Sequence, residues 1–161
     1  MAKDRNDLPT LIDEMEKLRD VTIQVGPIGD PDVLPYAGVQ EFGATIKVSQ
    51  SYRNYVFAMG YGIPDEITIP ERSYLRSSFD DKKTMGRIMD EALPAVADLF
   101  NGRGGWEDVA DQIGKTMVEI IQEKIQSNIG PANHAVTIAL KGHGNTLLDT
   151  GALFQSIEAR Y

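Results

Sequence analysis

One long apolar stripe constrains the fold of this chain more than any other feature. Between Trp106 and Gln126 the apolar residues recur every three or four positions, which is the spacing of one face of an α-helix. Glu107 and Asp108 stand in the first turn, where the helix dipole favours negative charge. Because a helix of this kind must bury its apolar face, the sequence predicts a core built against residues 106–126.

A second long helical segment is expected over about residues 73–100. Asp80 or Asp81 is a candidate restart of the helix, and Pro94 is expected to kink or divide it, because proline lacks the N–H that helix continuation needs. A short helix over residues 36–42 is expected to end at Gly43, a candidate left-handed C-cap. Further helices are predicted over about residues 7–18 and 149–157.

Segments rich in β-branched and aromatic residues predict the strands, at about residues 21–25, 45–48, 52–59 and 66–69. The predicted fold is a single α+β domain over residues 1–161, with a small mixed or antiparallel sheet of about four to five strands packed against two long helices plus short helices. Val136–Leu140 fits a helix or a strand equally. The aromatic residues of the 52–61 region fit either cross-strand packing or a contact surface.

Charge and composition exclude several functions. The chain has 161 residues, and its 24 acidic and 16 basic residues give a net charge of −8, which argues against tight nucleic-acid binding but permits a duplex to pass nearby. It has no cysteine, so thiol nucleophiles, thiolate metal sites and disulfides are excluded. No apolar run reaches the roughly 20 residues of a membrane helix, and the charged N-terminus lacks a signal-peptide pattern, so a cytoplasmic product is expected.

The string Leu148-Asp149-Thr150-Gly151 admits two readings. It matches the signature of aspartic proteases, in which two such aspartates share a proton. A two-lobed enzyme needs a second Asp-[Thr/Ser]-Gly, which the sequence lacks. The alternative is a helix start, with the Asp149 carboxylate capping the backbone N–H groups of Gly151 or Ala152. Capping is the favoured interpretation.

No other residues form a convincing catalytic, cofactor or metal site. His134 and His143 are the only histidines, and a metal triad of both with Asp149 would need ordered scaffold at defined spacing, which this loop-rich segment does not offer. The sequence therefore predicts no enzyme activity, no cofactor and no metal.

Three blocks of sequence, in order, resemble the tail-completion and neck proteins of tailed bacteriophages, also called virion-morphogenesis proteins. The blocks are Tyr36–Val48, Ile69–Arg76 and Leu147–Ile157. The residues that carry the resemblance, expected to be structural or assembly determinants, are Tyr36, Glu41, Phe42, Gly43, Pro70, Arg72, Leu75, Leu148, Asp149, Thr150 and Gly151.

The resemblance implies an α+β virion protein without enzyme activity. It implies a homo-oligomer, a hexameric ring at the head–tail junction, that contacts other neck and tail proteins and lets DNA pass without specific binding. It also implies assembly in the host cytoplasm and no membrane partner. A monomeric protein-binding adaptor in tail assembly is an alternative, and a small aspartic-type hydrolase is a more distant one.

The distribution of charge suggests which surfaces such a ring would use. Residues 80–128 hold ten acidic and six basic residues, a net charge of −4, whereas residues 129–161 hold two of each, a net charge of zero. We therefore expect the aromatic strand region and the neutral C-terminal segment to be the contact surfaces, and the acidic helices to face the lumen or solvent.

Overall fold

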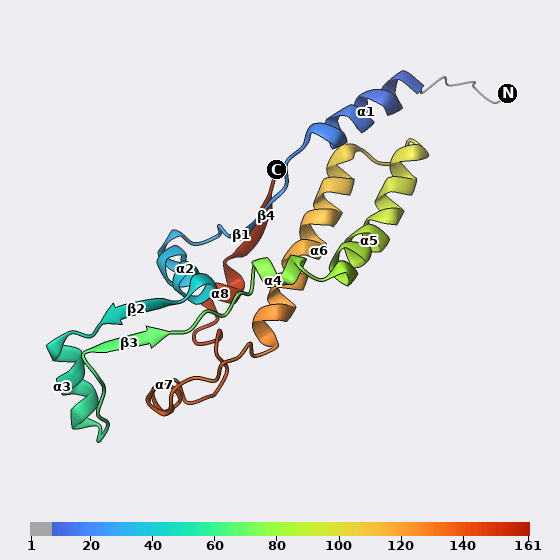
Figure 1. The fold of residues 1–161 in the computed structure, drawn as a ribbon. Helices are drawn as coiled ribbons and strands as arrows, with labels where there is room; N and C mark the ends of the chain where they lie inside the picture. The colour runs from blue at the N-terminus through green and yellow to red at the C-terminus, as the bar shows by residue number, and fades with distance from the viewer. Residues whose placement is uncertain (1–7) are drawn as a thin grey trace.

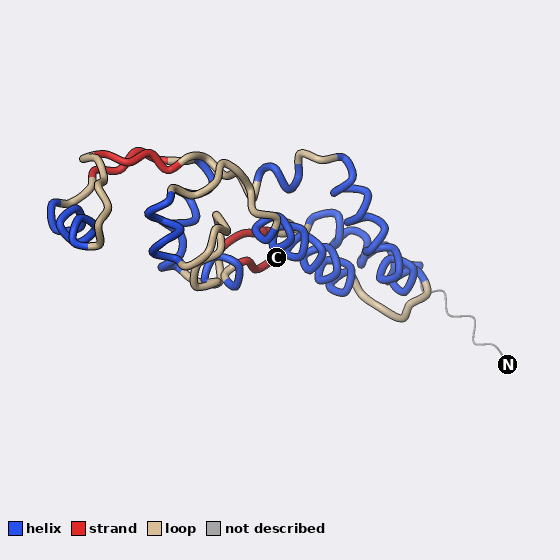
Figure 2. The backbone as a smooth tube through the Cα atoms, turned by 90° about the horizontal axis from the view of Figure 1, so that it is seen from below, coloured by secondary structure: helices blue, strands red, loops and turns tan. Residues whose placement is uncertain are grey.

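The computed structural model describes residues 8–161 and shows an elongated α+β molecule (Figures 1 and 2). Three helices form one end, a two-stranded ribbon that carries a helix forms the other, and short elements lie between them. The helices are α1 (Leu8–Asp20), the 3-10 turn η1 (Pro31–Val33), α2 (Leu34–Phe42), α3 (Gln50–Ala58), α4 (Arg76–Phe79), α5 (Lys82–Phe100), α6 (Trp106–Gln126), α7 (Ala135–Lys141) and α8 (Ala152–Gln155). The strands are β1 (Gln24–Pro27), β2 (Ala44–Lys47), β3 (Glu66–Ile69) and β4 (Ile157–Arg160).

The central element is α6, as its apolar stripe predicts. It packs along α5 in a helical hairpin, and α1 lies against both helices (Figure 1). The start of α6 is held from α1, because the Glu14 carboxylate accepts a hydrogen bond of 2.8 Å from the Trp106 N–H. The first N–H groups of a helix have no partner within the helix, so this contact satisfies one of them and joins the two helices.

The strands β1 and β4 pair antiparallel and lie on α6. Gly114 of α6 permits the close approach, because a Cβ atom built there would lie 2.9 Å from the Cβ of Ala159 in β4. The pairing of Gln24 with Arg160 and of Pro27 with Ile157 brings the C-terminal segment back beside the segment that follows α1.

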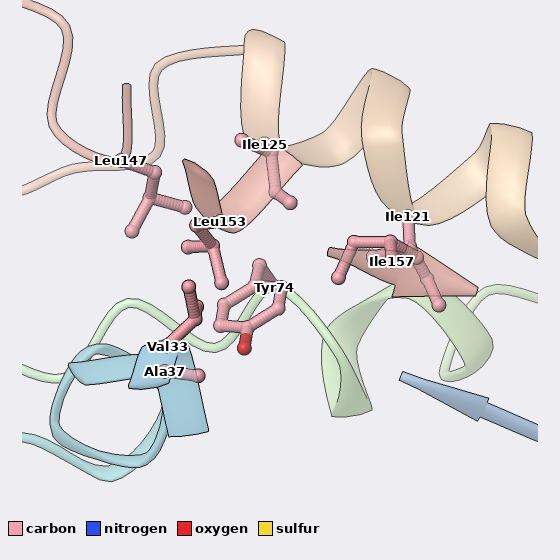
Figure 3. Close-up of a cluster of buried hydrophobic side chains, with 8 residues drawn as sticks. All are labelled: Val33, Ala37, Tyr74, Ile121, Ile125, Leu147, Leu153 and Ile157. Atoms are coloured by element: carbon pink, nitrogen blue, oxygen red, sulfur yellow. The ribbon is translucent and has the colours of Figure 1, made fainter. Parts of the chain in front are cut away.

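The principal core gathers side chains from distant parts of the sequence (Figure 3). Tyr74 lies at its centre and is completely buried. The other members come from η1, α2, α6 and the C-terminal segment: Val33, Ala37, Ile121, Ile125, Leu147, Leu153 and Ile157. The three sequence blocks that carry the family resemblance therefore share one core.

The segment 44–69, which we call the arm, consists of β2, α3 and β3. It extends away from the three long helices in both views (Figures 1 and 2). β2 and β3 pair antiparallel, with Ala44 opposite Ile69. Val56 is the one buried residue of the arm, so the arm has almost no core of its own.

Several sequence predictions about strands are wrong. Two separate antiparallel pairs replace the expected sheet of four to five strands. Residues 52–59, predicted as a strand, lie mainly in helix α3, which begins because the Ser49 hydroxyl caps the Tyr52 N–H at 3.2 Å. The strand predicted at 21–25 occurs at Gln24–Pro27, and Ile157–Arg160 forms a strand that was not predicted.

The helix predictions hold better, with corrections at their ends. α6 matches its predicted range, and α1 covers the predicted 7–18 segment apart from Asp7, which lies outside the described residues. The 73–100 segment is two helices, α4 and α5, separated where Asp81 caps the Lys83 N–H at 2.9 Å. Pro94 does not divide α5, which is continuous through it.

Two further predictions concern short helices. The ambiguous segment around Val136 is helical, in α7. The helix predicted over 149–157 is limited to Ala152–Gln155 in α8.

Within residues 8–161, no helix combines the length and the apolar character needed to cross a membrane.

Candidate functional site

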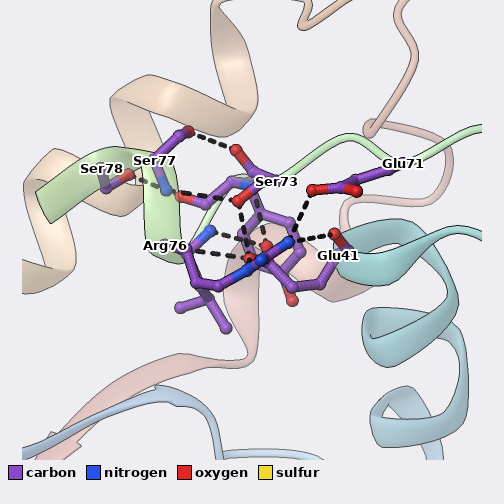
Figure 4. A network of polar contacts seen from close by, with 8 residues as sticks. Glu41, Glu71, Ser73, Arg76, Ser77 and Ser78 are labelled. Atoms are coloured by element: carbon purple, nitrogen blue, oxygen red, sulfur yellow. Dashed lines mark hydrogen bonds and ion pairs between the residues drawn. The ribbon is translucent and has the colours of Figure 1, made fainter. Parts of the chain in front are cut away.

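The carboxylate of Glu41 connects the first two sequence blocks (Figure 4). Glu41 stands in the last turn of α2 and is only 2% exposed. Its two oxygens accept five hydrogen bonds, all from residues 73–76: from the Ser73 hydroxyl at 2.8 Å, from the backbone N–H groups of Tyr74, Leu75 and Arg76 at 2.8, 2.9 and 3.1 Å, and from Arg76 Nε at 3.0 Å. The carboxylate thus satisfies backbone donors at the start of α4.

The environment of Glu41 favours its charged form. Burial acts to raise the pKa of the Glu41 carboxyl, but the hydrogen bonds from Leu75, Ser73 and Arg76 outweigh burial and hold the pKa below its ordinary value. A buried carboxylate that is fully hydrogen-bonded in this way stabilises the fold, and removing it would leave several buried donors without an acceptor.

The neighbours of Glu41 complete the junction. The Arg76 guanidinium also binds Glu71 Oε1 at 2.6 Å and lies over the ring of Phe42, 4.9 Å from its centroid. Gly43 has φ of +71° and ψ of 164°, so its φ is positive as predicted although its ψ is not that of a left-handed helix. A Cβ atom at Gly43 would lie 2.9 Å from the Glu71 nitrogen, so any side chain there would meet the chain that follows Pro70.

Arg72 connects the second block to the C-terminal region. It is 4% exposed, and its backbone N–H donates to the Gln40 carbonyl at 2.8 Å. Its guanidinium donates to the Pro131 carbonyl at 3.0 and 2.9 Å, to Asn133 Oδ1 at 3.2 Å and to Gln40 Oε1 at 3.2 Å. Burial lowers the pKa of Arg72. The residue organises three segments through neutral acceptors.

Tyr36 brings the first block against the third. A cavity of about 230 Å³ lies between them, lined by Val33, Tyr36, Leu147, Asp149, Gly151 and Leu153, among others. Burial, followed by the negative charge of Asp149, raises the pKa of the Tyr36 hydroxyl. The half-buried Leu75 and Leu148 pack against the core.

The prediction that Asp149 caps a helix is wrong. Asp149 is exposed, and among residues 8–161 no hydrogen bond reaches its carboxylate. Thr150 Oγ1 instead accepts from the Ala152 N–H at 3.3 Å, and Gly151, with φ of +85°, occupies the N-cap position of α8. The backbone is clamped by Asn145, whose Oδ1 accepts from the N–H groups of Leu147 and Leu148 at 3.1 and 2.9 Å.

The junction also contains residues that the sequence patterns did not single out: Gln40, Ser73, Arg76, Asn133 and Asn145. The residue types of Asn133 and Asn145 are common in turns, but nothing local in the sequence indicates their partners. In the part of the chain that the structure describes, no cluster of three or more His, Asp or Glu side chains could hold a metal ion.

A larger groove of about 520 Å³ lies between the arm and α7. Its lining includes the apolar side chains of Ile67, Ile69, Val136 and Leu140, together with Arg72.

Comparisons with known protein families, with curated proteins and with solved structures found no match.

Proposed function

We propose that this chain is a structural subunit of a tailed-bacteriophage virion, a tail-completion or neck protein that forms a ring at the head–tail junction through which DNA passes. The resemblance of its three sequence blocks to that family motivates the proposal. The observation that supports it is the convergence of those blocks: Glu41 of the first block holds residues 73–76 of the second, and Leu147 and Leu153 of the third pack in one core with Tyr74.

The roles of the block residues support a structural function. Glu41, Gly43 and Arg72 satisfy backbone groups or permit close approach of two segments. Tyr36 and Leu148 pack beside the C-terminal part of the core. A set of residues chosen for these roles specifies a shape, which is what an assembly subunit requires.

The exposed position of Asp149 weakens the hydrolase alternative. An aspartic protease needs its two carboxylates to share a proton in a common groove. Asp149 and Asp32 line the same small cavity, but both residues are exposed, and among residues 8–161 no hydrogen bond joins their carboxylates. The remaining alternative, a monomeric adaptor, differs from the ring subunit in its assembly state.

Native mass spectrometry and negative-stain microscopy of the purified full-length chain, from about 1 to 100 µM, test the ring. We expect closed rings of six subunits with a central hole. Disrupting the coding sequence in the phage genome that carries it should give filled heads and complete tails that do not join, and the wild-type gene supplied in trans should restore joining.

Each of these results can count against the proposal. Infectious particles formed without the protein would rule out the neck role. A chain that stays monomeric but binds one isolated tail protein would favour the adaptor. Cleavage of a denatured protein substrate by the wild-type chain, but not by an Asp149→Asn variant, would favour the hydrolase.

A further inference from the structure

The contacts within the arm are too few to make it stable by itself. An isolated two-stranded antiparallel ribbon is marginally stable in water, and among the strands of residues 8–161 β2 and β3 pair only with each other. Val56 is the one buried side chain that α3 contributes, while Tyr55 of α3 is 57% exposed. Inside the arm Arg53 pairs with Asp65, which fixes the helix to the ribbon but buries little apolar surface. These features indicate that another molecule covers the arm.

One face of α3 is suited to such a contact. Tyr52, Tyr55 and Met59 follow the i, i+3, i+7 spacing and therefore lie on the same side of the helix. The rings of Tyr52 and Tyr55 are 6.3 Å apart, so they form one aromatic surface. Phe57, which is 77% exposed, falls on the opposite flank by the same spacing argument.

A second apolar surface, exposed within the described residues 8–161, lies at the other end of the molecule, on α5. Its exposed side chains Met85, Met89, Leu93 and Phe100 follow helical spacing beside the face that packs on α6. Met89 is 63% exposed. The helix carries three acidic and three basic residues, so this stripe is not part of a strongly charged surface. Figures 1 and 2 both place α3 far from the long helices, so the two surfaces do not meet within one chain.

We infer that the α3 face of one subunit, formed by Tyr52, Tyr55 and Met59, docks on the α5 stripe of a second copy of this chain. The inference deepens the ring proposal and rests on it. The two surfaces differ and lie at opposite ends, as head-to-tail contacts require, and such contacts close a ring when the rotation between neighbouring subunits fits. The second surface is thus α5, in place of the neutral C-terminal segment suggested by charge alone.

The chemistry and area of the two surfaces fit this pairing. Methionine sulfur makes favourable contacts with aromatic rings, and here two methionines face two tyrosines. If a fully exposed large side chain presents roughly 200 Å², the two surfaces together offer roughly 700 Å² of apolar area, which is less than the roughly 1,000 Å² that a stable two-subunit contact needs. One contact is therefore weak, and closure of a ring, in which every subunit is held on both sides, makes the assembly stable.

Disulfide trapping tests the contact directly, because the chain has no native cysteine. Tyr55→Cys and Met89→Cys chains, distinguished by mass, are mixed at about 50 µM and oxidised gently. We expect the yield of the mixed disulfide dimer to exceed greatly the yield of either homodimer. Phe57→Cys mixed with Met89→Cys is the matched control, because Phe57 lies on the opposite flank of α3, and it should give at least tenfold less mixed dimer.

Measurements of self-association provide a second, independent test. Tyr55→Ser and Met89→Lys, each at an exposed position, should fold as the wild type does and should each weaken self-association at least tenfold in native mass spectra. Mixing the two variants should restore a 1:1 complex, because each retains the surface that the other has lost. Phe57→Ser should associate as the wild type does.

Rings that persist in Tyr55→Ser or Met89→Lys would overturn the inference and leave the proposed neck role standing. Trapping through Phe57 in place of Tyr55, or disulfides only between two Tyr55→Cys chains, would also overturn it, since the contact would then use another face or pair arm with arm. The inference is also refuted if the Tyr55→Cys and Met89→Cys chains form no mixed disulfide and the wild-type chain does not associate up to about 100 µM. Head–tail joining still decides the neck role separately.

Discussion

Replacing Glu41 with glutamine is expected to destabilise the fold strongly and to remove part of its pH dependence. The Glu41 carboxylate accepts five hydrogen bonds, including those of the backbone N–H groups of Tyr74 and Leu75. Hydrogen bonds to charged groups contribute about 1.5–3 kcal/mol each, but they are not additive, and glutamine keeps one acceptor oxygen. We therefore expect a loss of about 2–4 kcal/mol, or roughly 5–10 °C in Tm for a chain of this size.

The pH dependence of the loss follows from the lowered pKa of Glu41. A carboxyl whose folded pKa is depressed stabilises the fold fully above its unfolded pKa, near ~4.3, and this contribution disappears as the pH falls through the folded pKa. The stability gap between wild type and Glu41→Gln should therefore be constant from about pH 5.5 to pH 8. It should shrink as the pH falls below about 4.3.

Urea unfolding followed by the fluorescence of Trp106 and by circular dichroism measures the gap at each pH. The matched control is Glu71→Gln, because Glu71 binds the same arginine, at 2.6 Å from Arg76, but its side chain is 55% exposed. Exposed ion pairs contribute about 0–1 kcal/mol, so this variant should stay within about 0.5 kcal/mol of wild type. A Glu41→Gln protein as stable as wild type, or a gap that is unchanged down to pH 3, would refute the assigned role of Glu41.

Three further predictions concern stability, and urea unfolding at pH 7 checks each. Gly43→Ala should lower the free energy of unfolding by about 1–3 kcal/mol, because the residue has a positive φ and its new Cβ would lie 2.9 Å from the Glu71 nitrogen. Gly86→Ala, at an exposed position of α5, should instead raise the free energy of unfolding by up to about 1 kcal/mol. Equal effects of the two substitutions would contradict this contrast. Tyr74→Phe should leave stability unchanged or raise it by about 1 kcal/mol, because the buried Tyr74 hydroxyl has no hydrogen-bond partner within residues 8–161. A loss of stability above about 1 kcal/mol would reveal a partner. Asn145→Ala should lower the free energy of unfolding by about 1 kcal/mol or more, while Asp149→Ala should change it by less than about 0.5 kcal/mol. A larger loss for Asp149→Ala than for Asn145→Ala would show that Asp149, and not Asn145, holds this backbone.

The sequence predicts the parts of this fold whose signals are local and periodic. The apolar stripe from Trp106 to Gln126 defines α6 without reference to any other segment. Asp81 begins α5 through a hydrogen bond to a residue two positions away, so its role is also readable from the sequence. In both cases the interaction that determines the element lies within a few residues of it.

The errors arise where local propensity and structure diverge. Tyr, Val and Phe favour strands, and they dominate residues 52–59. The Ser49 cap and the isolation of the arm, which offers no further strand for pairing, give a helix there. The prediction of one sheet of four to five strands is wrong for a related reason, because the sequence of a strand does not indicate how many other strands it will pair with.

The candidate site was only partly predictable from the sequence. Its residues were identified by resemblance, but the partners of Glu41 lie more than thirty positions away, and those of Arg72 lie up to sixty-one positions away. Asp149 and Asn145 illustrate the limit, because both are good capping residues by type. Only the three-dimensional course of the chain decides that Asn145 reaches backbone N–H groups and Asp149 does not.

The arm has one more consequence, because its two ends stand together where it leaves the body. Ala44 lies opposite Ile69 in the ribbon, and Gly43 lies against the chain that follows Pro70. Residues 44–69 therefore leave the body and return to it at one place, so exchanging this segment between two such proteins is expected to leave the path of the remaining chain unchanged. If the arm makes the contact inferred above, the graft is also expected to transfer the choice of neighbouring subunit.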